Sequence, residues 1–361
     1  MKIRMLCALL CALAMGSAKA DLADDLIKAA DSVKRLRTQW TQGTLPSAIN
    51  LDDEVAALTR MIADGKLNEA GLAVAHYYRA DANLLANETR VRNNLQLDVA
   101  AARTALADYD RIIARGKDIA DWGVDVSNAG YSAGWIAAYH LASMPLAYGY
   151  WEKCAELFHA GCMSTIAAAK VTGAGGMKID IPQAMYWNAK VYSAGTGYGC
   201  AGAYSARDNS LILHFMVPNH RPQEEIEWLN RGRGLLDELA VKEKSSNPCN
   251  RTRFDVFEYL MRLSQGDERK PLLKSALERA QAEEDKATAR YLSGTIDDDA
   301  FRAVAAKALS KPAQCSMHFV AMWSAEINRN AALSREHLRS MRDLGQEFCA
   351  TELAYVKKYQ R

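Results

Sequence analysis

The sequence predicts an all-α protein, an α-solenoid of antiparallel helical hairpins that is held by disulfides and exported from the cytoplasm. Three observations lead to this prediction. The chain begins with a segment typical of an export signal, and six cysteines remain once that segment is removed. Apolar side chains recur at helical spacing through the rest of the 361 residues, with no convincing run of strand-like alternation. Together they describe a helical scaffold in an oxidising compartment.

The first twenty residues have the layout of a cleavable export signal. Residues 2–4 carry two basic side chains, residues 5–15 form an uncharged apolar run, and Ala18 and Ala20 supply the small side chains that signal peptidase requires. A membrane anchor would need about 20 apolar residues, roughly twice this run. Lipoprotein processing at Cys11 is disfavoured by the bulky leucine before it. We therefore expect cleavage after Ala20 and a periplasmic or secreted mature protein.

The mature chain is almost neutral. Removal of residues 1–20 takes away three of the 45 basic residues, which leaves 42 against 43 acidic ones. A neutral chain lacks the electrostatic footprint of a protein that binds nucleic acid or an anionic membrane. No later segment is long and apolar enough to span a bilayer. We expect neither a nucleic-acid partner nor membrane insertion.

An even number of cysteines remains after cleavage, which in an exported chain indicates disulfides. Zinc binding is the competing interpretation, but the mature chain has no CxxC pair and its seven histidines show no ligand spacing. Disulfides are therefore the favoured use. The six cysteines are Cys154, Cys162, Cys200, Cys249, Cys315 and Cys349.

Helix formers dominate the mature chain, and its few prolines mostly mark joints between helices. Consecutive segments are expected to form hairpins, as residues 67–86 do with residues 97–114. Asp298 and Ser334 are the expected N-cap residues of two later helices, since their side chains can accept hydrogen bonds from first-turn amides. The other expected segments are 129–143, 145–158, 163–171, 182–192, 201–216, 222–239, 253–264, 270–292, 298–309, 314–327 and 334–359.

A repeat is visible in the middle of the chain. A Tyr-Trp pair ending at Trp151 recurs at Trp187, 36 residues later, and Trp228 follows after another 41 residues. Cys162 and Cys200, 38 residues apart, each follow a glycine and open the next helix. Periods in this range are typical of stacked helical hairpins. Because each hairpin needs a neighbour to cover its apolar face, the repeating tryptophans are expected in the core.

Residues 150–200 carry a more specific pattern. Cys154 and Cys162 are separated by seven residues, with a glycine before the second, and a Gly-x-Gly turn at Gly173 and then Asp180 follow. This pattern resembles the Sel-one-like repeat, a variant of the tetratricopeptide repeat, and is similar to its secreted, cysteine-rich bacterial branch. The resemblance implies that the cysteine pair bridges one hairpin to the next. It also implies that the Gly-x-Gly turn joins helix A to helix B and that Asp180 precedes helix B.

The resemblance covers one good repeat. The interval from the Gly-x-Gly turn to the aspartate is one residue longer than the family pattern, and Tyr192 stands where the next repeat would have its partner cysteine. Residues 67–116 resemble a plainer tetratricopeptide hairpin. We therefore expect three parts: the signal at 1–20, a helical-hairpin repeat region at 21–249, and a C-terminal helical region at 250–361 packed on the solenoid.

Geometry favours one set of bridges among the 15 that six cysteines allow. A disulfide needs Cα atoms roughly 4.4–6.8 Å apart, and the two cysteines of the C-x7-C pattern span one short turn. Cys315 and Cys349 lie equally far on either side of an expected turn near residue 332, which would bring them level. That leaves Cys200 with Cys249, at opposite ends of a third hairpin.

One pattern of catalytic type is present. Residues 130–134 fit the G-x-S-x-G turn that exposes the nucleophilic serine of α/β-hydrolases, with Ser132 as the serine. That turn needs a buried strand before it, whereas residues 123–128 are short and polar. The alternative is a helix whose small residues let a neighbouring helix approach closely. We favour this packing interpretation.

Other chemical motifs are absent from the sequence. It contains no HExxH, and the glycine-rich run at 173–176 lacks the lysine and hydroxyl residue of a phosphate loop. It also lacks the Ser-x-x-Lys and Lys-Thr-Gly boxes of β-lactam-binding enzymes. Three acids at 297–299 are explained by the dipole of the helix that they open, without a cation. We expect neither a metal nor a cofactor.

Tyr131, Trp135 and Tyr139 fall at i, i+4 and i+8 and so form one stripe on a helix. Tyrosine and tryptophan are enriched at protein interfaces because they bury much area at little entropic cost. The alternative is that the stripe belongs to the solenoid core. These three residues are the candidate partner-binding residues.

The favoured hypothesis is a solenoid that binds a protein partner, in its specific form a periplasmic inhibitor or immunity protein against a secreted effector. The alternative is a cell-envelope hydrolase or glycan-acting enzyme with a site assembled from distant helices, and a third hypothesis is a purely structural envelope protein. For the hydrolase, four carboxylates are available, although each is expected on a solvated face. They are Glu156, Glu224, Glu225 and Glu227.

Overall fold

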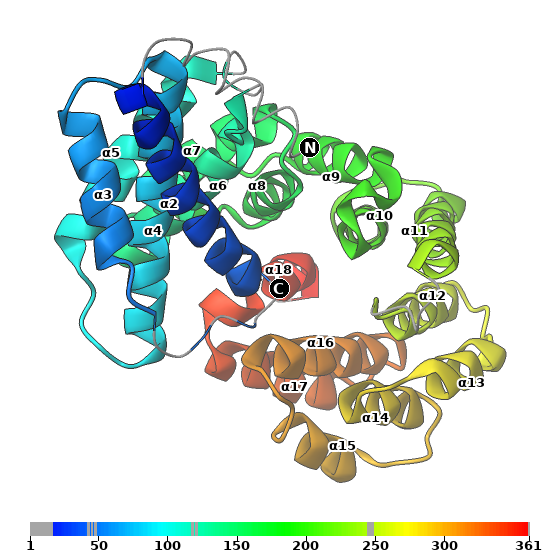
Figure 1. The fold of residues 1–361 in the computed structure, drawn as a ribbon. Helices are drawn as coiled ribbons and strands as arrows, with labels where there is room; N and C mark the ends of the chain where they lie inside the picture. The colour runs from blue at the N-terminus through cyan, green and yellow to red at the C-terminus, as the bar shows by residue number, and fades with distance from the viewer. Residues whose placement is uncertain are drawn as a thin grey trace. The chain divides into compact units, whose positions relative to one another are not determined.

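The computed structural model describes residues 17–41, 49–116, 122–243 and 249–359, together with the single residues 44, 46 and 119. Within this part of the chain there are 17 α-helices, α2 to α18, and no strand, which confirms the all-α prediction (Figure 1). Most of the predicted export signal lies outside the described residues. The cleavage point after Ala20 therefore stays a prediction.

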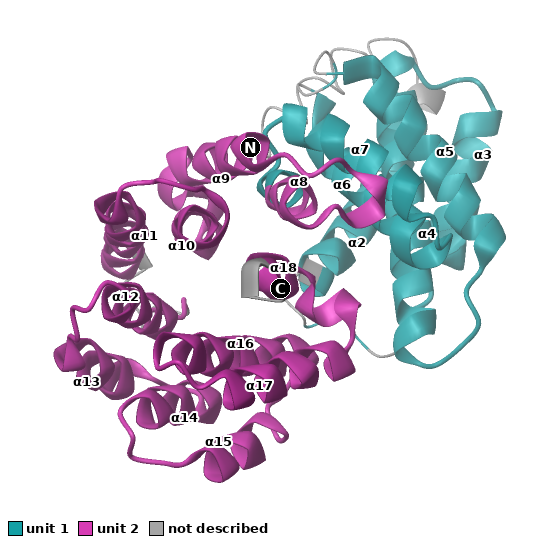
Figure 2. Cartoon of the chain, turned by 180° about the vertical axis from the view of Figure 1, so that it is seen from behind, with its two compact units in different colours: residues 1–163 teal, residues 164–361 magenta. Residues whose placement is uncertain are grey.

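The chain divides into two compact units, residues 1–163 and residues 164–361 (Figure 2). The helix α8 (Ala160–Thr172) crosses this boundary. The sequence also predicts a boundary after Cys249, between the helical-hairpin repeat region and the C-terminal helical region. That boundary stays a prediction. Unit 1 holds α2 (Ser17–Thr41), α3 (Asp52–Ala63), α4 (Glu69–Arg92), α5 (Val99–Arg115), α6 (Val126–Trp135), the π-helix η2 (Ile136–His140) and α7 (Met144–Glu156).

Unit 2 holds ten further α-helices and three short 3-10 turns in the part that the structure describes. The 3-10 turns are η3 (Ala174–Gly176), η4 (Gly195–Tyr198) and η5 (Val356–Tyr359). The α-helices are α9 (Ile181–Ser193), α10 (Cys200–Met216), α11 (Pro222–Glu243), α12 (Thr252–Ser264), α13 (Lys270–Arg279), α14 (Glu283–Leu292), α15 (Asp298–Ala305), α16 (Lys311–Ile327), α17 (Ala331–Leu344) and α18 (Gln346–Tyr355).

Helices that are adjacent in the sequence pack as pairs in both units: α4 with α5, α6 with α7, α10 with α11, and α16 with α17. Polar caps fix where many of them begin. Asn68, Asp98, Asp125 and Asp180 each accept a hydrogen bond from the backbone amide three residues ahead, which satisfies one of the free amides of the first turn. Asp180 thus opens α9 as the resemblance implied. The sequential pairs confirm a helical, repeat-like architecture.

Unit 2 is closed by its last helix. Its helices follow one another in a curved row, and α18 returns to contact α10 (Figure 1). Phe215 of α10 and Tyr355 of α18 stack with ring centroids 5.6 Å apart, and the fully buried Trp323 of α16 lies 4.7 Å from Phe215. One hydrophobic core therefore joins the first helices of the unit to the last.

Three disulfides are present among the described residues, and they join the pairs expected from the sequence. The Cα atoms of Cys154 and Cys162 are 5.8 Å apart, and those of the Cys200–Cys249 and Cys315–Cys349 pairs are each 5.6 Å apart. The first bridge links α7 to α8. Three bridges indicate an oxidising, extracytoplasmic environment. Among the described residues, no helix has the length and apolar character needed to cross a membrane.

Two of the predicted helices are interrupted. The segment 270–292 forms α13 and α14, with Ala280 in an extended conformation between them. The segment 334–359 is broken at Gly345, whose φ of +108° lies in the region that favours glycine. The predictions of single helices were wrong at both places. A glycine explains the second break, whereas residues 280–282 are good helix formers, so tertiary packing overrides their local preference.

The two predicted N-caps were also wrong by a few positions. Asp297, one residue before Asp298, accepts from the amide of Ala300 at 2.8 Å, because it is the last residue in extended conformation before α15. Asn330 caps α17, and Ser334 lies inside that helix. The side chain of Asp298 is thereby left for other contacts.

Candidate binding site

The three predicted aromatic residues form one line on unit 1. Their ring centroids are 6.5 Å apart for Tyr131 and Trp135, and 4.3 Å apart for Trp135 and Tyr139. Trp40 of α2 adds an edge-on contact to Trp135 at 6.0 Å, and His159 stacks on Tyr131 at 4.9 Å. Tyr139 is 59% exposed, whereas Tyr131 and Trp135 are half-buried. The stripe therefore runs from packed helices out to solvent.

Glu88, near the end of α4, holds the outer part of this stripe in place. Its Oε1 accepts hydrogen bonds from Trp135 Nε1 at 2.7 Å and from His140 Nε2 at 3.0 Å. Burial alone would raise the pKa of Glu88, but the hydrogen bonds from His140 and Trp135 outweigh it, and the pKa is lowered. The ionised carboxylate fixes the indole ring. The ring lies beside η2, and π-helical insertions are frequent at functional sites.

The turn between η2 and α7 is unusually apolar. Residues 126–151 contain no Asp, Glu, Lys or Arg, although these make up 24% of the chain and about six would be expected in 26 residues. The turn between α4 and α5 lies at the same edge of unit 1, because Glu88 joins the end of α4 to η2 and because α5 contacts η2. Large apolar side chains that are 39–59% exposed lie on or next to these two turns. This apolar edge consists of Val91, Leu95, Val99, Tyr139, Met144 and Leu146.

The G-x-S-x-G pattern lies inside α6 and not at a strand-to-helix turn. Ser132 is fully buried, and its hydroxyl accepts a hydrogen bond from Arg37 Nη2 at 2.6 Å. A Cβ atom at Gly130 would lie 2.9 Å from the nearest atom of α7, and one at Gly134 would lie 2.2 Å from the Trp151 indole nitrogen. The two glycines thus let α7 pack directly on α6, which is the packing interpretation.

Arg37 connects this serine to a second buried group. Its Nη1 lies 3.3 Å from Asp81 Oδ1, and the hydroxyl of Tyr109 donates to the same oxygen. Burial raises the pKa of the Asp81 carboxyl, and the nearby Arg37 charge and the Tyr109 hydrogen bond oppose that shift. Arg37 also lies 4.6 Å from the centre of the Trp40 ring. Arg37 therefore ties α2 to α4 and α6. Its guanidinium, unlike an imidazole, has no acceptor site, so it cannot take the proton of Ser132 as a catalytic base would.

One of the four candidate carboxylates is not on a solvated face, so that expectation was wrong for Glu225. It is 1% exposed, its Oε2 accepts from His214 Nδ1 at 3.0 Å, and its Oε1 is bonded to His220 Nε2. Both histidines belong to the end of α10 and the following turn, so the cluster ties α10 to the start of α11. The other three carboxylates lie at the surface or half-exposed: Glu156, Glu224 and Glu227.

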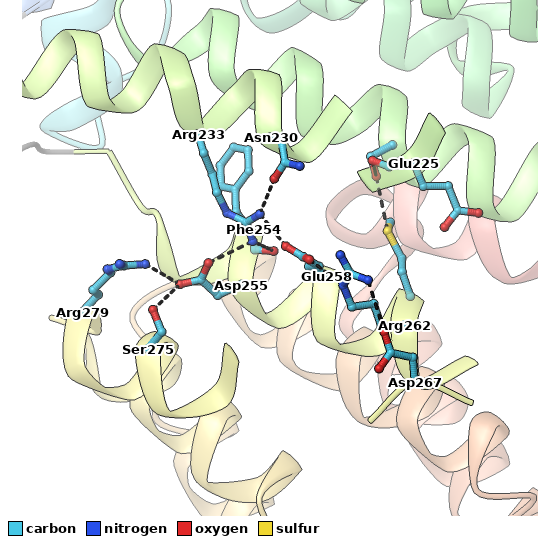
Figure 3. A network of polar contacts seen from close by, with 12 residues as sticks. Glu225, Asn230, Arg233, Phe254, Asp255, Glu258, Arg262, Asp267, Ser275 and Arg279 are labelled. Carbon is cyan, nitrogen blue, oxygen red and sulfur yellow. Dashed lines mark hydrogen bonds and ion pairs between the residues drawn. The ribbon is translucent and has the colours of Figure 1, made fainter. Parts of the chain in front are cut away.

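Figure 3 shows a chain of alternating charges that joins α11, α12 and α13 in unit 2. Arg233 of α11 donates to Asp255 at 2.9 Å and to Glu258 at 2.5 Å. Arg279 donates to Asp255 at 2.9 Å, and Arg262 donates to Glu258 at 2.6 Å. The Asp255 and Glu258 side chains are only 3% and 8% exposed. Because both carboxylates are paired and buried, this network serves as a scaffold and offers no free charge to a ligand.

One group of described residues has the spacing of metal ligands. It consists of Cys154, His159 and Cys162. Both sulfur atoms belong to one disulfide, however, and a disulfide supplies no thiolate ligand. The acids at 297–299 have other roles, since Asp297 caps α15 and Asp298 accepts from His337.

Comparison with protein-family models found no match to this chain, and comparison with curated proteins found no similar sequence. The structure of the described residues therefore establishes an all-helical fold with sequential helix pairs and three disulfides, without assigning a family.

Part of the apolar edge escaped the sequence analysis. Tyr139 was found through its helical spacing from Trp135. Val91, Leu95 and Val99 have the same four-residue spacing, but a turn separates α4 from α5 there, so the spacing does not mark one helix face. The run without charges at 126–151 was the available signal for Met144 and Leu146. Nothing in the sequence placed the α4–α5 turn beside them, because that requires the contact of Glu88 with Trp135.

Proposed function

We propose that this is an exported helical-repeat protein that binds a protein partner through the apolar edge of unit 1. The observation that carries the proposal is the presence of six exposed apolar side chains at two turns of unit 1, one of which, between η2 and α7, carries no charged residue. Contiguous exposed apolar surface in a soluble protein typically marks an interaction site. Tyr139 and Trp135 add the residue types that contribute most of the binding energy in protein interfaces.

Trp135, which lies beside the apolar edge, is suited to binding a protein partner. Trp135 is held by Glu88 and packed against Trp40, so it loses little conformational freedom on binding. The near-neutral chain, with 42 basic and 43 acidic residues after residue 20, gives no electrostatic reason to expect a nucleic acid instead.

In its specific form, the proposal is a protein of the Sel-one-like type that acts as a periplasmic inhibitor or immunity protein against a secreted effector. The C-x7-C bridge between hairpins and the Asp180 cap support the repeat type, and the three disulfides support an extracytoplasmic location. A direct test takes toxic proteins encoded next to this one and measures whether the mature chain binds and neutralises them. Binding without neutralisation would support a protein partner but refute the inhibitor role.

The general proposal is tested by capture from a periplasmic extract. The oxidised mature chain should retain a partner in stoichiometric amount, and the triple variant Tyr139→Ala/Met144→Ser/Leu146→Ser should lose it. A matched control changes Leu309 and Val241, which are 95% and 80% exposed on unit 2, to serine. The control should keep the partner. Equal capture by the triple variant, or no stoichiometric partner for the wild type, would refute the proposal.

A further inference from the structure

A chain of three hydrogen-bonding groups runs through the last third of unit 2. His318 Nδ1 of α16 lies 3.0 Å from His337 Nδ1 of α17, and His337 Nε2 lies 2.8 Å from Asp298 Oδ1 of α15. The His337 side chain has no exposed surface. Three helices are thus joined through one buried imidazole.

The geometry of these hydrogen bonds determines which nitrogen atoms of the two histidines carry protons. Ionised Asp298 is an acceptor only, so His337 carries its proton on Nε2 and presents a lone pair at Nδ1. That lone pair accepts the proton on His318 Nδ1. A proton added to His337 Nδ1 would place two N–H groups against each other, and a second proton on His318 would bring two positive rings into contact. The intact chain therefore requires a neutral His337.

The charges around the pair also disfavour protonation of His318. Arg302 of α15 is ion-paired with Asp298 and bonds Glu336 of α17 at 2.8 Å, and Tyr291 of α14 packs beside His337 at 6.4 Å. Burial, the neighbouring imidazole and Arg302 lower the pKa of His318 to about 4, against the weaker opposing effect of Asp298. Burial likewise lowers the pKa of His337.

Helix α15, which these hydrogen bonds hold in place, has its own small hydrophobic core. Phe301 and Ala305 of α15 pack with Ala287 of α14 and with Met317 and Ala321 of α16, in a cluster separate from the main core of unit 2. The helix spans only Asp298–Ala305 and contacts chiefly α14 and α16. It can therefore detach without breaking the main core, as low-stability segments do in local opening.

We propose that the Asp298–His337–His318 chain is an acid-sensitive latch that holds α15 at neutral pH and releases it on acidification. A proton on His337 Nδ1 removes the acceptor of the hydrogen bond between the histidines, and a proton on either imidazole places positive charge beside Arg302. The open form, in which the imidazoles are hydrated, binds these protons more readily than the closed form, so acid favours opening. Release exposes Phe301 of α15 and the surface under it, including Tyr291 and Met317.

Amide hydrogen exchange of the full oxidised chain tests the latch, with rates corrected for the intrinsic pH dependence of exchange. A pKa of about 4 in the closed form and 6.5 in the open form predicts an opening constant about 30-fold larger at pH 5.0 than at pH 7.5, from His318 alone. Peptides that cover residues 298–305 should lose protection by this factor, and peptides of α10 should not.

Variants separate the latch from a general acid effect. His318→Gln keeps an N–H donor for His337 without a titrating group, so it should remove the roughly 30-fold contribution of His318 and leave only that of His337. His159→Gln in unit 1 replaces a half-buried histidine whose pKa burial also lowers, and it should leave the change intact. Equal protection of α15 at both pH values in the wild type would overturn the proposal. So would an unchanged response in His318→Gln. If that variant fails to fold, the wild-type titration still decides, because loss of protection must develop between pH 6.5 and pH 4.

Discussion

Replacement of Gly134 by alanine tests the function of the G-x-S-x-G pattern directly. The added Cβ atom would lie 2.2 Å from Trp151 Nε1 and 2.5 Å from its Cδ1. Ordinary carbon–nitrogen contacts are near 3.5 Å, so the indole ring must move by more than about 1 Å. The ring is 5% exposed, and its N–H donates to the carbonyl of Tyr131 at 3.3 Å, so it has no free space to move into.

The expected loss of stability follows from these contacts. Overpacking of a well-packed core costs about 1–3 kcal/mol, and a buried donor left without its acceptor adds about 1 kcal/mol. We therefore expect Gly134→Ala to destabilise unit 1 by about 2–4 kcal/mol. Gly149→Ala on α7 is a matched control, because apart from the backbone of its own helix and its chain neighbours no atom lies within 4 Å of its added Cβ. In the middle of a helix this change should be neutral or stabilise by up to about 1 kcal/mol.

Urea unfolding followed by hydrogen exchange of unit 1 peptides measures the difference for each unit separately, since two units need not unfold in one step. A Gly134→Ala protein as stable as the Gly149→Ala protein would show that close packing does not explain the glycine. The packing interpretation of residues 130–134 would then be refuted.

Two further predictions concern unit 2 and the disulfides. Arg233→Ala leaves the buried Asp255 and Glu258 with one fewer cation each and should cost about 3–5 kcal/mol in urea unfolding, whereas Arg279→Ala, whose side chain is 47% exposed, should cost about 1 kcal/mol or less. Equal losses would contradict the role given to the charge network. Replacing both cysteines of a bridge by serine should cost about 4 kcal/mol for Cys200–Cys249, with a sequence separation of 49, but only about 2.5 kcal/mol for Cys154–Cys162, with a separation of 8. The reverse order in thermal unfolding would show that native packing, and not chain entropy, decides the effect.

Local features of the fold were accessible from the sequence. Hairpins such as α4–α5 and α10–α11 follow from apolar periodicity and short connections. The Asp180 cap is a contact between neighbours in the sequence. The pairing of Cys315 with Cys349 was expected from the symmetry of one hairpin, and it holds although Cys349 lies on α18, beyond the break at Gly345. These signals depend on residues that share a helix or a turn, so one sequence suffices to find them.

Features that depend on distant contacts were not accessible. The bond from Trp135 to Glu88 joins residues 47 apart, and the latch joins Asp298 to His337 across 39 residues. No propensity marks such partners. The aromatic stripe from Tyr131 to Tyr139 pointed toward the candidate site, and the uncharged run at 126–151 marks the turn that follows it. Neither identifies the neighbouring α4–α5 turn.

The return of α18 onto α10 separates unit 2 from an ordinary stack of repeats. In a stack, each hairpin touches only its neighbours, so repeats can be added or deleted and the ends fray independently. Here the contact between Phe215 and Tyr355 spans 140 residues, and forming it requires closure of a very long loop. Unit 2 should consequently fold slowly and lose its end helices together. Deletion of the last helix would expose the inner face of α10, so the chain cannot be shortened from its C-terminus one hairpin at a time.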